Sequence, residues 1–246
     1  MEFELLAFGL ITGFTSGFFG IGGGSILIPM LLVAGFAVKE AVAISIMQMV
    51  FSSIYGSFLN SKKIKGLFRD GIILGVGASV GGLFSGYFLP SIPDIYLQYL
   101  FIAVLIYTIY TLFKAPASQE VIQEDKNIFL LAFIGFCVGI FAMSIGIGGS
   151  LMLLPILVQF LKYDLKVATA LGLFFVIFSS IGGFISTSLY GNMLYYEGAI
   201  IGIGSLIGVY FGIKIKEKTK STSYKKFVLL LNLFVLATMI YKTVEF

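Results

Sequence analysis

Two glycine-rich stretches contain the residues of this sequence that are best suited to bind a ligand. They read GFFGIGGGSILIP and MSIGIGGSLMLLP, and both lie in strongly apolar surroundings. Each glycine destabilises a helix by up to about 1 kcal/mol relative to alanine, so we expect a helix to break and restart at each stretch. A restarted helix offers free N–H groups and about half a unit of positive charge, which together favour an anion. The candidate anion-binding residues are Gly20, Gly22, Gly23, Gly24 and Ser25 in the first stretch, and Gly146, Gly148, Gly149 and Ser150 in the second.

Two structural roles compete with this interpretation. Small residues also let membrane helices pack closely, and we expect that role for the glycines outside the two stretches. Ser25 is in addition a candidate cap for the restarted helix.

Polar residues in the apolar segment after each stretch are the second group of candidates. Ser45, Gln48 and Ser52 recur at spacings of three and four, so they share one helix face. Burying such groups without partners is unfavourable, which makes them candidates for contact with a polar ligand. The alternative is that each serine or threonine bonds a carbonyl of its own helix. The corresponding candidates in the second half are Thr169 and Ser179, while Phe175 takes the place of Gln48.

The composition identifies the class of protein. The chain has 246 residues, of which 59% are hydrophobic and only 11% charged, and its mean hydropathy is +1.05. Soluble domains carry about 25% charged residues, so this is an all-α polytopic membrane protein. It has no His and a single Cys, which argues against metal and haem sites and against a His-dependent nucleophile. We therefore expect no enzyme activity, no cofactor and no nucleic-acid partner.

The apolar segments predict about 8–10 membrane segments, because a span needs about 20 helical residues. Each glycine stretch divides a segment that is too long for one span, giving a broken or re-entrant helical hairpin. The expected segments are 4–36 with a break at 20–24, then 40–60, 70–89, 94–114, 128–161 with a break at 146–149, 165–189, 195–214 and 224–241.

An internal repeat relates the two halves of the sequence. Gly20, Gly22, Gly23 and Pro29 correspond to residues 126 positions later, and the offset becomes 127 beyond the prolines. The predicted organisation is a first membrane repeat at 1–114, a cytoplasmic connector at 115–127 and a second repeat at 128–246. Each repeat consists of one broken hairpin and three transmembrane helices.

The distribution of basic residues indicates that the two repeats are inverted. The loop at 60–70 carries four basic residues and its counterpart at 187–197 none, whereas the loop at 90–94 has none and its counterpart at 214–226 has six lysines. Cytoplasmic loops are enriched in Lys and Arg, so corresponding loops lie on opposite sides. With both termini outside, only Lys39 and Lys242 of the 16 basic residues lie outside a cell membrane. Interrupted helices in inverted repeats are typical of secondary transporters.

The doubled G-x-G-G-G/S…P motif, with Pro29 and Pro155, resembles that of the sulfite exporter TauE/SafE family of membrane permeases over nearly the whole chain. The resemblance implies transport of a small anion, sulfite or an organosulfur anion such as a sulfonate. We expect alternating access around the two glycine breaks, with no charged residue deep in a span. A channel without alternating access is the alternative, and a homo-oligomer stays open.

Overall fold

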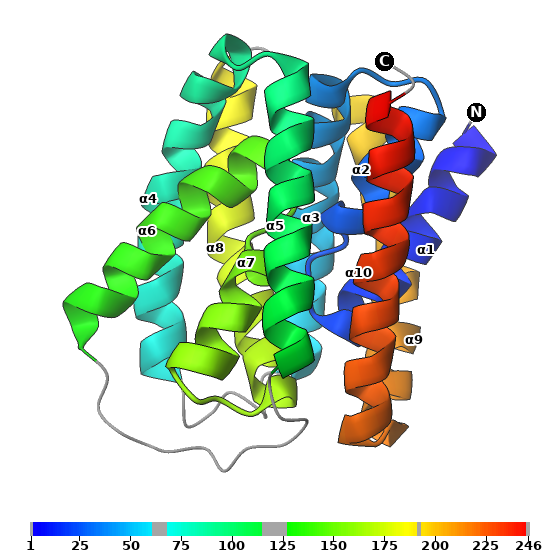
Figure 1. Ribbon diagram of the computed structural model, residues 1–246. Helices are drawn as coiled ribbons and strands as arrows, with labels where there is room; N and C mark the ends of the chain where they lie inside the picture. Colours follow the sequence, from blue (N-terminus) through cyan, green and yellow to red (C-terminus); the bar gives the residue numbers. More distant parts are fainter. Residues whose placement is uncertain (1, 61–67, 115–126, 191–192, 245–246) are drawn as a thin grey trace.

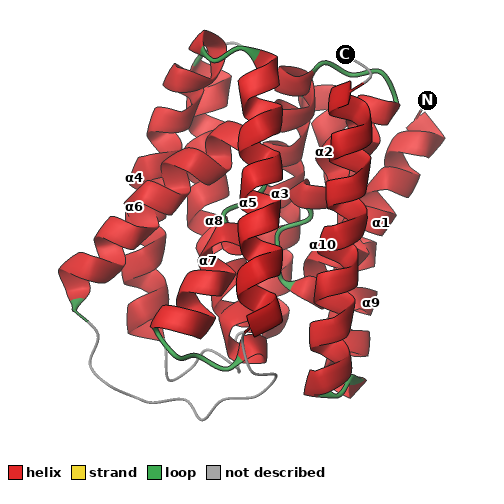
Figure 2. Ribbon diagram, in the orientation of Figure 1, coloured by secondary structure: helices red, strands yellow, loops and turns green. Residues whose placement is uncertain are grey.

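The computed structural model describes residues 2–60, 68–114, 127–190 and 193–244, and over these ranges it is built of helices and short turns (Figures 1 and 2). Both predicted helix breaks are confirmed. Helix α1 (Glu2–Phe19) ends directly before Gly20 and α2 (Gly24–Val33) follows, while α6 (Ile128–Ile145) ends before Gly146 and α7 (Ser150–Pro155) follows. The other elements are α3 (Val38–Asn60), α4 (Phe68–Phe88), η2 (Leu89–Ser91), α5 (Asp94–Lys114), η3 (Ile156–Phe160), α8 (Leu165–Leu189), α9 (Tyr195–Lys218) and α10 (Ser221–Val244).

The helix lengths fit a multi-pass membrane protein. Six of the described helices are long and apolar enough to cross a membrane, and two shorter apolar helices cover Gly24–Val33 and Ser150–Phe160. At 1.5 Å per residue the ten residues of α2 extend about 15 Å, roughly half of a hydrocarbon core. Helix α2 turns back toward the end where the N-terminus lies, and α7 turns back toward the opposite end (Figure 1). Each glycine break therefore lies inside the helix bundle.

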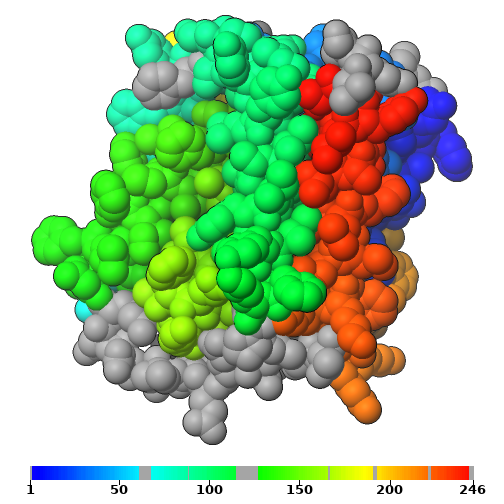
Figure 3. Space-filling model, viewed as in Figure 1, coloured from blue at the N-terminus to red at the C-terminus, as the bar shows by residue number. Residues whose placement is uncertain are grey.

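Helices α3 and α8 form the centre of the bundle. They contact each other, and the most hydrophobic windows of these two helices are 61% and 72% buried, against 22% for α10. Helix α9 packs on α3 and carries α1 on its other side, while α4 packs on α8 and carries α6. Helices α5 and α10 lie side by side across one face, where they cover α7 and α2 (Figure 3). The central pair carries most of the predicted polar site residues.

Glycines bring the outer helix pairs into backbone contact, as their role in packing predicts. A Cβ atom added at Gly13 of α1 would lie 2.1 Å from the Ser205 oxygen of α9. A Cβ atom at Gly77 of α4 would lie 2.2 Å from the Ala132 oxygen of α6. Close approach of this kind lets helices associate through van der Waals contacts without large side chains.

The prediction of a loop at 214–226 is wrong. Helix α9 continues to Lys218 and α10 begins at Ser221, so the six lysines lie almost entirely on helices. Helix propensity explains the difference, because lysine is a good helix former and KIKEK contains no breaker. The basic loop at 62–65 and most of the connector at 115–127 lie outside the described residues.

A π-helical turn, η3, extends α7 in the second half. Between Pro29 and the left-handed Gly35 the chain has five residues, whereas between Pro155 and the left-handed Lys162 it has six. A π turn takes one residue more than an α turn. The additional residue is therefore absorbed locally, at the place where the sequence offset changes from 126 to 127.

Candidate functional site

Break 1 (residues 20–23) and break 2 (residues 146–149) share one backbone conformation. The first, third and fourth residue of each break has a left-handed backbone, a conformation that costs other residues about 1–2 kcal/mol. This requirement explains why glycine occupies these positions in both stretches. The φ angles are 70°, 83° and 82° at Gly20, Gly22 and Gly23, and 77°, 82° and 76° at Gly146, Gly148 and Gly149.

The two breaks contact each other at the centre of the bundle. The Ser45 hydroxyl of α3 donates a hydrogen bond of 2.7 Å to the carbonyl oxygen of Gly146. A Cβ atom added at Gly24 would lie only 2.2 Å from that same oxygen. A Cβ atom at Gly148 would lie 3.4 Å from the oxygen of Ile21. Residues more than 120 positions apart therefore form one continuous site.

Three of the predicted site residues carry buried polar atoms without a hydrogen-bond partner. Both amide atoms of Gln48 and the hydroxyls of Ser25 and Ser150 are in this state, and each residue is at most 1% exposed. The Gln48 amide faces break 1, because a Cβ atom at Gly23 would lie 3.0 Å from both its oxygen and its nitrogen. An unsatisfied buried polar group costs about 1–3 kcal/mol. These groups can bind a polar ligand that enters the site.

Ser25 does not cap α2, contrary to the expectation from sequence. The helix begins one residue earlier, Gly23 occupies the N-cap position, and no side chain bonds the helix end. Ser25 lies instead in the first helical turn. The free N–H groups of the helix start and the partial positive charge of the helix dipole are both located there. The first turn of α2 therefore keeps its capacity to bind an anion.

The remaining predicted residues differ in their surroundings. The Ser52 hydroxyl lies 3.4 Å from the carbonyl oxygen of Gly22 and the same distance from that of Met49, so it borders break 1. Ser179 donates to the carbonyl of Val176 in its own helix, and its backbone packs on Gly82 of α4. For Ser179 the structure thus has the local hydrogen bond that was the alternative to a ligand contact.

The two breaks have different side chains around them. A Cβ atom at Gly149 would lie 2.5 Å from the ring of Phe175, the residue that corresponds to the Gln48 facing Gly23. Break 1 thus has an amide beside it and break 2 an aromatic ring. The surroundings of the two breaks therefore lack strict two-fold symmetry.

A buried lysine beside Thr169 was missed by the sequence analysis. Lys216 was placed in a loop, but it lies in the last turn of α9, is 1% exposed, and donates a 2.7 Å hydrogen bond to the Thr169 hydroxyl. The signal was its spacing, because Lys216 follows Gly208 and Gly212 at intervals of four residues, and these two glycines pack against α1. Thr169 in turn touches break 1, since a Cβ atom at Gly20 would lie 2.4 Å from its carbonyl oxygen.

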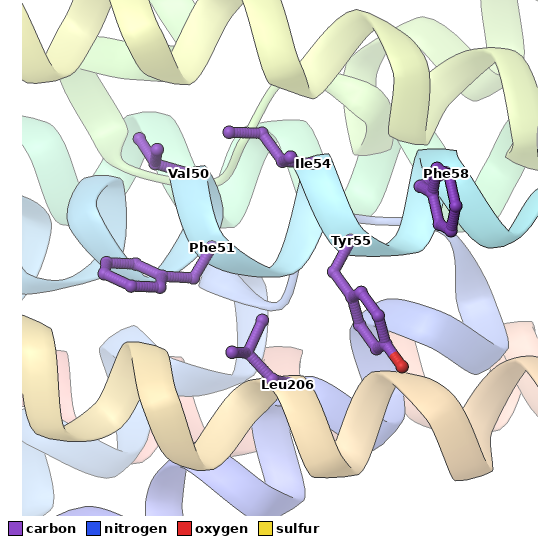
Figure 4. Close-up of a pocket in the computed structure, with 6 residues that line it drawn as sticks. All are labelled: Val50, Phe51, Ile54, Tyr55, Phe58 and Leu206. Atoms are coloured by element: carbon purple, nitrogen blue, oxygen red, sulfur yellow. The ribbon is translucent and has the colours of Figure 1, made fainter.

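The grooves described on the outside of the bundle differ in character from this central site. The example in Figure 4 is lined by apolar and aromatic side chains of α3 and by Leu206 of α9, and it contains none of the predicted site residues. Apolar grooves on a membrane protein suit lipid tails. The polar chemistry belongs to the buried contact between the breaks.

Comparison with known proteins identifies relatives over most of the chain. The family model described as "Sulfite exporter TauE/SafE" matches residues 5–239. A probable membrane transporter protein of Methanocaldococcus jannaschii is 29% identical over 242 residues, covering 89% of this chain and 90% of the relative. The probable membrane transporter protein YdhB of Bacillus subtilis is 25% identical over 210 residues, covering 83% of this chain and 86% of the relative. No solved structure matches significantly.

Proposed function

The chain belongs to the sulfite exporter TauE/SafE family, and from this premise we propose that it carries sulfite or an organosulfur anion by alternating access around the two helix breaks. It is a multi-pass membrane transporter and not an enzyme. The proposal concerns the substrate, the residues that bind it and the way in which the substrate crosses.

The single observation that carries the proposal is the unsatisfied polar group of Gln48 beside the start of α2. The amide is fully buried, lacks a hydrogen-bond partner and faces break 1. The Ser25 hydroxyl, in the first turn of α2, has the same properties. An oxyanion placed here would accept hydrogen bonds from the amide N–H, the hydroxyl and the helix N–H groups. Because the donors are neutral, binding depends on dipoles, which suits a substrate that must also be released.

A correspondence between the two halves is supported by the pairing of helices between the two parts of the chain, and their inversion by α2 and α7, which turn back toward opposite ends (Figure 1). Helix α1 packs on α9, and the corresponding pair is α6 on α4. Likewise α3 on α9 corresponds to α8 on α4, and α2 on α10 corresponds to α7 on α5. The first helix of each half thus packs on the third long helix of the other half. With this intertwined arrangement, rocking of one half would move both breaks together.

Alternating access is favoured over a channel by the burial of the site. Residues 15–29 and 142–151 are all buried in the structure, so neither break is open to solvent. At one end Lys39 donates to the Pro90 carbonyl at 3.0 Å and lies 3.8 Å from Asp94. At the other end Tyr163 donates to Asp70 at 2.5 Å, and burial together with that carboxylate raises the pKa of Tyr163. We propose that these contacts open in turn as the site faces each side.

The orientation follows from charge within the same proposal. Both termini lie at one end of the bundle (Figure 1). The lysines of α9 and α10 from Lys214 to Lys226 lie at the other end, since α9 ends and α10 begins there. Cytoplasmic ends of membrane proteins are enriched in Lys and Arg, so we place both termini outside the cell membrane.

The test is uptake of radiolabelled sulfite into proteoliposomes, with and without unlabelled sulfite inside. The binding site of a carrier changes sides of the membrane more readily with bound substrate than when it is empty. Internal sulfite is therefore expected to accelerate uptake. Uptake that internal sulfite does not accelerate would favour a channel. If vesicles with correctly folded protein take up no sulfite, the proposed substrate is wrong and sulfonates are measured next.

A further inference from the structure

Lys216 is the buried cation closest to break 1. Its ammonium group donates to the Thr169 hydroxyl at 2.7 Å and lies 5.8 Å from the centre of the Tyr224 ring. The Tyr224 hydroxyl donates to the carbonyl oxygen of Phe19, the last residue of α1, at 3.0 Å. Lys216, Tyr224 and Thr169 are each at most 1% exposed. A buried cation is stable only where it interacts with a counter-charge or dipole, and the Thr169 hydroxyl provides such a contact for Lys216.

The polar cluster of Lys216, Thr169 and Tyr224 adjoins break 1. Thr169 contacts Gly20 through its backbone, and Tyr224 bonds Phe19, the residue directly before Gly20. Lys216 lies in the last turn of α9 and Thr169 in the first turns of α8. The group therefore lies between break 1 and the end of the bundle at which α8 begins and α9 ends.

The corresponding positions of the first half are all apolar. With the offset of 127 residues, Thr169, Lys216 and Tyr224 correspond to Val42, Leu89 and Leu97. These three side chains are each 1% exposed, and Val42 contacts Gly146 just as Thr169 contacts Gly20. A requirement of the fold alone would apply equally to both halves. The polar group at one end therefore indicates a role that only one of the two routes needs.

We propose that Lys216, Thr169 and Tyr224 form a second anion-binding site, through which substrate passes between break 1 and the cytoplasmic end. This inference rests on the proposed function and adds a charged residue to it.

The competing explanation is that the lysine only stabilises the C-terminal end of α1, where helix carbonyls carry partial negative charge. The two roles differ in a measurable way. A structural lysine would change the thermal stability of the protein without changing its apparent affinity for an anion. An anion-binding lysine would change the affinity.

The experiment compares Lys216→Gln and Lys216→Arg with the matched control Lys218→Gln, which removes the same charge from an exposed position of the same helix end. Equilibrium exchange of radiolabelled sulfite gives the concentration for half-maximal rate. We expect Lys216→Gln to raise this concentration about tenfold, through loss of a hydrogen bond from a charged group. Lys216→Arg should stay within about threefold because it keeps the charge, and Lys218→Gln should match the unmodified protein.

A second measurement separates this inference from the proposed substrate. Sulfate, a stable tetrahedral anion, should raise the thermal unfolding temperature of the unmodified protein and of Lys218→Gln, and should raise it less for Lys216→Gln. Equal sulfate shifts in all three proteins, or no shift in any, would overturn the second site. The second site would also be overturned if the unmodified protein and Lys216→Gln both exchange sulfite with the same half-maximal concentration. That result would leave the proposed function intact. If the unmodified protein exchanges no sulfite, the proposed substrate fails and the sulfate shift alone decides on the second site.

Discussion

Break 1 and break 2 have the same backbone but different neighbours. Both place left-handed glycines at the first, third and fourth position. Break 1 faces the Gln48 amide, Thr169 and, through Thr169, Lys216, whereas break 2 faces Phe175 and Val42 and accepts a hydrogen bond from Ser45. The comparison separates two requirements. The shared glycines belong to the geometry of a broken helix, and the proposed function assigns the side chains found only at break 1 to recognition of the substrate.

The largest expected effect concerns the feature that the two breaks share. Gly23→Leu and Gly149→Leu should both abolish sulfite exchange, because each places a side chain at a left-handed position with an atom already within 3.0 Å of the new Cβ. Exchange in proteoliposomes and the amount of protein in the membrane fraction are the measurements.

Gly35→Leu is the matched control for this pair. Gly35 is also left-handed, at φ 94°, but a Cβ atom there would have nothing within 4 Å. It should keep most of the exchange activity despite similar backbone strain. Full exchange in both break variants would disprove the assignment of the breaks to the substrate path.

The next effect should distinguish the two breaks. Gln48→Leu should lower sulfite exchange at low concentration at least tenfold, because it removes the amide that faces break 1. It should also raise the unfolding temperature, since a buried amide without a partner is unfavourable by about 1 kcal/mol or more. Phe175→Leu should reduce exchange by less than threefold, because it exchanges one apolar neighbour of break 2 for another. If the two variants lose equal activity, the functional difference between the breaks does not exist.

A smaller difference is expected between the two serines that follow the breaks. Ser25→Ala should raise the half-maximal sulfite concentration about fivefold, through loss of one neutral hydrogen bond. Ser150→Ala should change it less than twofold, because Ser150 follows break 2, where Phe175 takes the place of the Gln48 amide. Exchange measured over a range of sulfite concentrations tests the pair. A larger effect at Ser150 would assign the substrate to the other break.

The smallest effect is expected at Ser179. Its hydroxyl bonds the carbonyl of Val176 in its own helix and its backbone faces α4, so Ser179→Ala should leave exchange within about 1.5-fold of the unmodified protein. Ser52→Ala, by contrast, alters a hydroxyl next to Gly22 and should reduce exchange about threefold. Thermal unfolding of both variants provides the control for folding. Equal losses would show that proximity to break 1 does not determine which of the two hydroxyls supports activity.

The sequence was sufficient for those features that depend on local chemistry. Glycine clusters within apolar segments predicted where α1 and α6 end, because a helix interior does not tolerate several glycines with left-handed backbone. The prediction of a loop at 214–226 is wrong, because a run of lysines is compatible with a helix and does not by itself indicate a loop. The prediction of Ser25 as a helix cap is also wrong, because the sequence does not define the first residue of a helix to within one position.

Alone, the sequence determined that this is an all-helical membrane protein with two broken helices and a family-specific glycine motif, because hydropathy, glycine content and spacing are properties of short segments. Only the tertiary structure decided which residues meet. Ser45 bonds Gly146, and Lys216 bonds Thr169, across separations of 101 and 47 residues. Such contacts depend on how helices from the two parts of the chain pack, and on whether a polar group at a helix end is buried by them. Local sequence carries no direct record of either.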